Sequence, residues 1–339
     1  MQHTKTLFIL LIISLVLTLI TCGGGGGGGD KEVTITYNAN GATSGSVPAS
    51  QKTLLYQSIV AQTNSGNLER TGYIFDGWNY NDGHNQRIGE GGLLTPVSDM
   101  TLYARWVELP TMISIPGRDI KMSKTEVTIE LYSMLSRDYY TTGIEDHNLF
   151  SVHLGNLYEH DKYPVSEVSW FEAVRFCNDL STLYRLSPVY TINGKSVSQD
   201  LSANGFRLPT VEEWQYAAAG GEAYIYAGSN NINDVAWIDW NKTSWDASLF
   251  ITHPVAQKKA NGYGLYDMSG NAWEWCWDIH FDPGKSDYRA TQGGSVCSGS
   301  EPYQCRVLYT NHYEQAEYDA NIYPRGTYTD IGIRLVCKE

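Results

Sequence analysis

The sequence is short of basic residues and lacks the common catalytic motifs. Its 339 residues include 24 lysines and arginines against 37 aspartates and glutamates, which gives a formal net charge of −13. Because nucleic-acid binding depends on clustered positive charge, this balance argues against DNA and RNA as partners. No H-E-x-x-H, G-x-S-x-G or Walker sequence is present, so the usual protease, hydrolase and nucleotide-binding signatures are missing.

Cysteine and histidine are also sparse. The six cysteines include no C-x-x-C pair, and no cysteine–histidine cluster has zinc spacing, so we expect no structural zinc site. The eight histidines are scattered, and we expect His253 and His280 to be structural or exposed. Five cysteines follow Cys22, and this odd number leaves at least one thiol unpaired or paired between chains.

One long apolar run is present, at residues 7–20, and it follows the single lysine Lys5. Its length suits a signal peptide better than a membrane span. The run ends in residues 19–22, Leu-Ile-Thr-Cys, which look like a bacterial lipobox, although threonine before the cysteine is unusual. The alternative is an ordinary secretory signal that happens to end near a cysteine.

The glycine run at residues 23–29 favours the lipoprotein interpretation, because glycine without side chains makes a flexible tether. We therefore predict a signal peptide over residues 1–21, acylation of Cys22 and a tether over residues 22–32. The protein would be exported, attached to the membrane by lipid, and located in a bacterial cell envelope, at the outer membrane or cell surface.

The rest of the chain has a folded composition, 42% hydrophobic and 18% charged, and its length suggests about two domains. Residues 33–107 form the first, which we call the N-terminal module. Alternating apolar residues predict strands at 33–37 and 101–106, with a third aromatic segment at 72–78 between them. Aromatic residues at strand spacing indicate a small β core.

Three motifs in this module occur in a known order: NANG at 38–41, GYIFDGW at 72–78 and TLYARW at 101–106. Together they resemble the Listeria–Bacteroides repeat, a small β-grasp-like module of surface proteins. The resemblance implies a spacer or adhesive role, not an enzyme.

Residues 111–339 form the second unit, the C-terminal domain, for which we expect an α+β fold with much irregular structure. Ser169 with Glu172, and Thr210 with Glu213, have capping-box spacing and predict two helices, the second ending at about Ala219. Asn-Gly at 193–194 predicts a β-hairpin turn.

Longer motifs fill this domain. They are PVSEVSW at 164–170 with AVRFCN at 173–178, RLPTVEEWQYA at 207–217, NGYGLYDMSGNAWEW at 261–275, and GGS at 293–295 with GIRL at 332–335. In this order they resemble the formylglycine-generating-enzyme, or sulfatase-modifying factor, family. The resemblance implies a fold related to C-type lectins, and we expect its tryptophans 170, 214, 273 and 275 to lie in the core.

The resemblance also implies a calcium site within residues 261–275. Matched position by position, its ligands would be Asp267, the carbonyls of Gly270 and Ala272, and Glu274. Two carboxylates and backbone carbonyls on a glycine-containing turn are suitable ligands for Ca²⁺. The alternative is that Asp267 caps a turn and Glu274 pairs with an arginine.

Active members of this family hold Cu(I) between two cysteines spaced C-x-x-x-x-C after the G-G-S motif. Here Cys297 comes one residue early, and seven residues separate it from Cys305. The remaining catalytic positions would be Ser295, Trp273 and Asp330, the last standing where the family has asparagine.

Three interpretations of Cys297 and Cys305 remain open: a structural disulfide, a copper pair with altered geometry, or two unrelated thiols. Cys276 is expected to be a buried thiol. The resemblance also makes a Cys177–Cys337 disulfide plausible.

Two functions follow as hypotheses. The first is a binding or structural lipoprotein with a degenerate copper site and a protein or glycan ligand. The second is a copper-dependent oxidase that converts a cysteine of an exported sulfatase to formylglycine.

Overall fold

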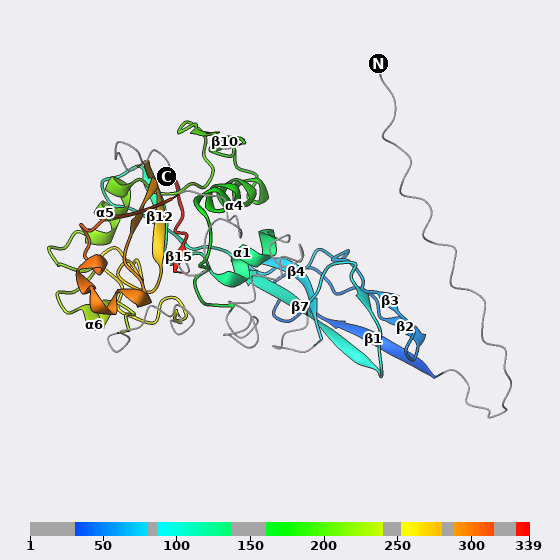
Figure 1. Ribbon diagram of the computed structural model, residues 1–339. Helices are drawn as coiled ribbons and strands as arrows, with labels where there is room; N and C mark the ends of the chain where they lie inside the picture. Colours follow the sequence, from blue (N-terminus) through cyan, green and yellow to red (C-terminus); the bar gives the residue numbers. More distant parts are fainter. Residues whose placement is uncertain are drawn as a thin grey trace, which may run out of the picture.

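The computed structural model describes residues 31–80, 87–136, 161–194, 196–239, 252–279, 288–314 and 330–339. An elongated β module leads into a larger mixed domain, and the long strand β7 points from one toward the other (Figure 1). Cys22 and His280 lie outside the described residues.

The N-terminal module is built on a five-stranded sheet with the order β2-β1-β7-β4-β5 and a separate ribbon of β3 and β6. Its strands are β1 (Glu32–Asn38), β2 (Gln51–Leu54), β3 (Ile59–Val60), β4 (Tyr73–Asn79), β5 (Arg87–Ile88), β6 (Leu93–Leu94) and β7 (Met100–Glu108). The three strands expected from sequence are confirmed as β1, β4 and β7.

Alternation in β1 explains the core of this module. Val33, Ile35 and Tyr37 are buried, while the residues between them are partly or fully exposed, because successive side chains of a strand point to opposite faces. Trp78 is fully buried and contacts the ring of Tyr37 at 4.7 Å between centroids. The predicted aromatic β core is therefore confirmed.

The C-terminal domain combines short strands, a few helices and long connections. Its elements are β8 (Met112–Ser114), β9 (Ile120–Ser123), α1 (Ile129–Leu135), α4 (Trp170–Leu183), β10 (Tyr190–Asn193), β11 (Ser196–Gln199), α5 (Val211–Ala219), α6 (Ile232–Val235), β12 (Trp273–Ile279), β13 (Tyr288–Gln292), the 3₁₀ turns η4 (Val296–Ser300) and η5 (Pro302–Cys305), β14 (Asn311–Glu314), β15 (Ile331–Gly332) and β16 (Val336–Lys338). The α+β class is confirmed.

Both predicted capping boxes are formed. Ser169 accepts a hydrogen bond from the Glu172 amide, and the Glu172 carboxylate accepts one from the Ser169 amide, which starts α4. Thr210 and Glu213 start α5 in the same way, and Gly220 ends it at φ 62°, a conformation that glycine adopts without strain. The hairpin of β10 and β11 is also present, paired in antiparallel register.

Two sheets organise this domain, with the orders β14-β13-β12-β15 and β16-β9-β8. β12 occupies an inner position, and α4 and α5 lie to either side of it (Figure 1). The four tryptophans predicted in the core are at most 2% exposed. They hold together a fold that has few long helices, as predicted.

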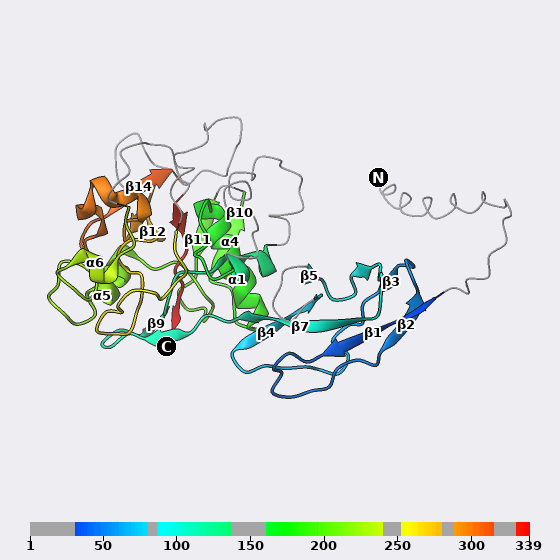
Figure 2. The ribbon, with the colours of Figure 1, turned by 90° about the horizontal axis from the view of Figure 1, so that it is seen from below.

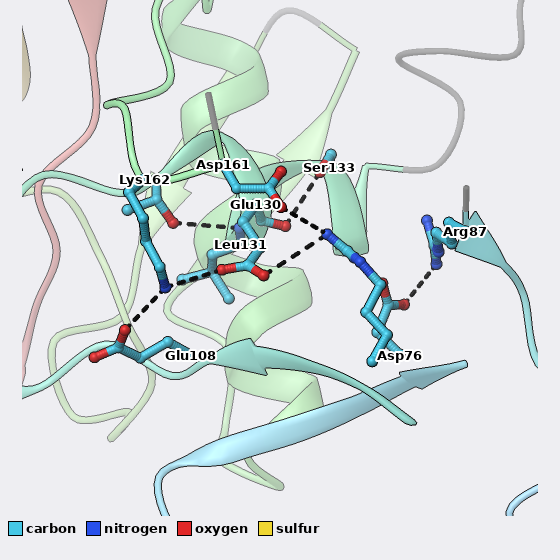
Figure 3. Close-up of polar contacts among 10 residues, drawn as sticks. Asp76, Arg87, Glu108, Glu130, Leu131, Ser133, Asp161 and Lys162 are labelled. Atoms are coloured by element: carbon cyan, nitrogen blue, oxygen red, sulfur yellow. Dashed lines mark hydrogen bonds and ion pairs between the residues drawn. The ribbon is translucent and has the colours of Figure 1, made fainter. Parts of the chain in front are cut away.

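Arg105 of β7 joins the two units. Figure 3 shows the charged residues of this joint, among them Asp76, Glu130, Asp161 and Lys162. The Arg105 guanidinium donates to Asp76 of the module at 2.7 Å and to Asp161 of the C-terminal domain at 3.4 Å, and it lies 3.7 Å from Glu130 of α1. Lys162 continues the network, with Nζ 3.1 Å from Glu130 and 2.9 Å from Glu108. Ion pairs centred on one buried arginine therefore connect the two units.

Val107 adds an apolar contact to this joint, because it belongs to the same buried cluster as α1 and α4. Among the described residues, none of the helices is both long and apolar enough to cross a membrane.

Candidate functional site

The turn that leads into β12 is held by its backbone and by Asn271. Asp267 and Asn271 adopt positive φ angles of 57° and 65°. The Asn271 side chain accepts from the amide of His253 and donates to Glu126 at 3.1 Å. The amide of Gly270 donates to the carbonyl of Gly293 at 2.8 Å. Residues far apart in sequence therefore fix the conformation of this turn.

A buried arginine lies beneath the turn. Arg334 is fully buried and donates from Nε to both Glu274 oxygens at 2.8 and 2.9 Å. Its other nitrogens donate to the carbonyls of Ser123 and Tyr266. Glu274 also accepts a hydrogen bond from Trp214 at 2.5 Å. The structure therefore contains the arginine pair that was the alternative to a calcium-binding Glu274.

Asp267 has a different environment. One carboxylate oxygen accepts from the Ala256 amide at 2.6 Å, while Oδ1 is buried without a hydrogen-bond partner. Glu126 lies beside it and also has a buried oxygen, Oε2, without a partner. Each residue is only 2% exposed. The only group beside these two oxygens among the described residues is the other carboxyl group, with which a hydrogen bond forms only if one of the two is protonated.

Burial raises the pKa of Glu126 well above its usual value, and repulsion from Asp267 raises it further. Burial also raises the pKa of Asp267, to about 6. Two adjacent buried carboxyl groups can be accommodated by a shared proton or by a cation between them.

The donor set fits a hard cation in part. Asp267 and Glu126 offer carboxylate oxygens, and the predicted carbonyl ligands of Gly270 and Ala272 lie on the same turn. Glu274 is committed to Arg334 and Trp214. No group of three or more His, Cys, Asp or Glu side chains in the described part of the chain is arranged to hold a metal. The fit depends on two carboxylates together with backbone oxygens.

Sequence reasoning missed Glu126. It stands 145 residues from Asn271, which binds it, and no local motif marks it. Its burial, which marks it as unusual for a carboxylate, becomes visible only in the structure.

A cavity of about 630 Å³ opens beside this pair at the joint between the two units. It is lined by Glu108 at the end of β7 and by residues of the C-terminal domain, among them Lys124, Glu126, Lys162 and Ala256. Glu126 and the loop that binds Asp267 therefore border a space large enough to admit water and small ions.

Most of the predicted catalytic positions gather around Asp330. Ser295 is fully buried and its hydroxyl makes a short hydrogen bond to Asp330. The amide of Trp273 donates to the Asp330 carbonyl at 2.8 Å. Burial raises the pKa of Asp330, and hydrogen bonds from Ser295 and the Cys297 thiol oppose that rise. Four of the five predicted residues therefore meet here.

Cys305 is the exception. It is fully buried at the end of η5, and burial raises the pKa of its thiol to about 12. Its thiol contacts Ser298 and the Gly270 amide, not Asp330. A side chain at Gly294 would come within 2.5 Å of the Cys305 sulfur, which explains the glycine at that position.

All five cysteines in the described residues occur as thiols. The suggested Cys297–Cys305 and Cys177–Cys337 disulfides are therefore absent, although Cys177 and Cys337 share Arg207 as a neighbour. Cys276 is a buried thiol, as predicted. Cys297 and Cys305 have different hydrogen-bond partners, Asp330 for the first and Ser298 for the second.

His253 is half-buried and stacks on Trp237 with centroids 3.8 Å apart. Its pKa is lowered by burial and by the nearby Lys258. This packing agrees with the structural role expected for it.

Comparisons with known proteins place these observations in a family. Residues 108–339 match the model of the sulfatase-modifying factor enzyme 1-like domain, and residues 34–105 match the Listeria–Bacteroides repeat domain. Chaperone protein LppX of Paenibacillus barcinonensis is 35% identical over 207 residues, covering 52% of this chain and 70% of LppX.

The formylglycine-generating enzyme of Streptomyces coelicolor is 32% identical over 155 residues, which cover 38% of this chain and 46% of the enzyme. The chain thus spans less than half of that relative. Among solved structures, CarF matches with a TM-score of 0.50 and 25% identity, covering 68% of this chain and 94% of CarF.

Proposed function

This chain belongs to the family of sulfatase-modifying factor enzyme 1-like domains, and we propose that it is an envelope lipoprotein whose domain binds a protein partner without copper chemistry. The observation that carries the proposal is that the two candidate thiols have different hydrogen-bond partners. Cys305 is buried against Ser298 with a pKa raised to about 12, while Cys297 binds Asp330. A Cu(I) site needs both sulfurs directed at one ion, and a buried thiol that is hydrogen-bonded elsewhere is poorly placed for that role.

An exposed aromatic surface beside the same site supports a binding role. Tyr303 is 41% exposed and contacts the ring of Tyr309, which in turn lies 6.2 Å from the ring of Trp273. Leu308 is 79% exposed, and the adjoining Val307 amide donates to the carbonyl of the exposed Ile225. Grouped exposed apolar residues mark interaction surfaces. We call Ile225, Tyr303, Leu308 and Tyr309 the aromatic surface.

The similarity to LppX suggests the class of partner. That relative is named a chaperone protein, and chaperones hold other proteins through exposed apolar groups. We propose that the aromatic surface holds incompletely folded segments of an exported protein, while acylation of Cys22 keeps the domain at the membrane.

A suppression assay tests this function. The protein is added to reduced insulin, whose B chain aggregates, and light scattering is followed. We expect the wild-type protein to suppress scattering and the Tyr303→Ser/Leu308→Ser variant to lose most of that effect. Leu201→Ser is the control, because Leu201 is 57% exposed but lies elsewhere. Equal suppression by all three proteins would contradict the role of the aromatic surface.

We also propose a calcium ion at the Asp267–Glu126 pair. The unsatisfied oxygens and raised pKa values support it, since a divalent cation would relieve the repulsion between the two carboxylates. Its contribution would be to stabilise the turn before β12.

The oxidase remains the second candidate. The meeting of Ser295, Cys297 and Asp330 favours it, because these positions correspond to the active site of the family. It would require Cys305 to leave its buried position and lose its proton.

A further inference from the structure

The ribbon of β3 and β6 presents a row of exposed apolar side chains. Val60 and Leu93 are cross-strand partners and are 54% and 68% exposed. At the other end of the ribbon the Tyr56 amide donates to the carbonyl of Pro96, which places Tyr56 beside Val97. Tyr56 is 69% and Val97 66% exposed.

These residues share one face. Ser58 and Thr95, which lie between the two apolar pairs, join their hydroxyls at 2.8 Å. The alternate residues Leu94 and Pro96 are buried, as strand alternation requires. The outer strip, defined as Tyr56, Ser58, Val60, Leu93, Thr95 and Val97, therefore carries no charged side chain.

Tyr56 is held in a strained conformation. Its φ is 64°, in the left-handed region that bulky residues avoid. Backbone strain usually persists only where other interactions offset its cost. Because the Tyr56 side chain is mostly exposed and gains little packing within this chain, its strain points to a function.

The strip lies where the chain enters the module. The Leu55 amide donates to the carbonyl of Lys31 at 2.8 Å, so the first described residue is adjacent to Tyr56. Figures 1 and 2 place β3 beside β2 and the start of β1, at the end of the module farthest from the C-terminal domain. Lys31 follows Cys22 by nine positions in the sequence, a length that spans at most roughly 30 Å.

We propose that the outer strip rests on the lipid surface to which Cys22 is anchored, with its apolar side chains in the headgroup region. This inference rests on the lipid anchoring in the proposed function. Anionic headgroups repel a chain with a net charge of −13, and an uncharged strip gives such a chain a face that can approach them. Tyrosine is favoured at this depth because it has an apolar ring and a polar hydroxyl.

Contact at this strip would fix the orientation of the module, which the tether alone cannot do. A flexible glycine-rich tether leaves the orientation of the module undetermined. A second contact close to the anchor point would orient the module on the membrane. The C-terminal domain lies at the opposite end of the module from β3 (Figure 2), so it would then be held away from the lipid.

The test uses the mature, acylated full chain in vesicles of phosphatidylethanolamine and phosphatidylglycerol. Tyr56→Cys carries an environment-sensitive fluorophore, and Leu201→Cys carries it as a control in the C-terminal domain. We expect a blue-shifted emission and quenching by spin-labelled lipid at position 56 and neither at position 201. Mass spectrometry of Cys22 is performed on the same protein.

The outcomes separate the two claims. A lipidated chain whose label at position 56 emits as in water overturns the strip contact and leaves the anchoring intact. A chain without lipid at Cys22 overturns both. A blue shift that increases with protein density without lipid quenching assigns the strip to a second copy and overturns the proposal.

Discussion

Two buried arginines of this protein differ in how they meet their carboxylates. Arg334 pairs directly with Glu274 alone, at distances of 2.8 and 2.9 Å, while Glu126 and Asp267 interact with it only through their charge. Arg105 is shared by three carboxylates from both units, at distances from 2.7 to 3.7 Å. The first arginine is a fixed part of the domain framework, whereas the second lies in a joint whose carboxylates are also shared with Arg87 and Lys162.

The largest effect is expected at Arg334. Arg334→Met leaves Glu274 buried without its cation, and such losses cost about 3–5 kcal/mol. Urea unfolding followed by tryptophan fluorescence measures the change. Arg118→Met is the control, since its pair with Glu212 is largely exposed and should contribute less than about 1 kcal/mol. If both variants lost a similar free energy of unfolding, the buried pair of Arg334 would contribute no more than the exposed pair of Arg118.

A smaller effect is expected at the joint. Arg105→Met leaves Asp76, Glu130 and Asp161 without their shared cation, but Asp161 can turn toward water because its side chain is 29% exposed. We expect a loss of about 2 kcal/mol, together with faster proteolysis near residues 109–110. Arg87→Met, whose ion pair among the described residues is with Asp76 of the same module, should leave that cleavage rate unchanged.

The joint should also respond to pH. Burial raises the pKa of Asp161 to about 6, against the opposing effect of Arg105. A carboxyl group whose pKa is raised in the docked state binds its proton more tightly there than in the separated state. The contribution of Asp161 to docking is therefore largest below about pH 4 and is lost as the pH rises through 6. Proteolysis near residues 109–110 should be slower at pH 5 than at pH 7.5.

Asp161→Asn checks the assignment of this pH dependence. The variant cannot ionise, so its cleavage rate should differ little between the two pH values. A pH dependence that is unchanged in Asp161→Asn would assign the effect to another group.

The smallest effect distinguishes the carboxylates near Arg334. Asp267→Asn and Glu126→Gln should remove the rise in melting temperature caused by calcium and change little in chelator. Glu274→Gln should lower the melting temperature equally in both buffers, since its partners are Arg334 and Trp214. If only Glu274→Gln lost the rise in melting temperature caused by calcium, Glu274 would be the ligand and the assignment to Asp267 and Glu126 would be wrong.

Local signals in the sequence predicted much of the fold. The capping boxes at Ser169 and Thr210 succeeded because each is completed within four residues. The strands of the N-terminal module succeeded because alternation is visible in a single segment. The family motifs added the order of the elements and most of the residues around Asp330.

The site could not be completed from sequence, because its decisive contacts are long-range. Glu126 meets Asn271 across 145 positions, and Arg334 meets Glu274 across 60. The environment of each cysteine was equally hidden, since the spacing of Cys297 and Cys305 does not reveal that η4 and η5 turn their thiols toward different partners.

Titration of Cu(I) under reducing conditions tests the central claim most directly. Wild-type protein, Cys297→Ser and Cys305→Ser are compared, and a Cys-x-Pro-x-Arg peptide reports formylglycine formation. We predict no stoichiometric copper binding that depends on both cysteines and no conversion of the peptide. One tightly bound copper ion that is lost in either variant, with formylglycine in the peptide, would contradict the assignment as a binding protein.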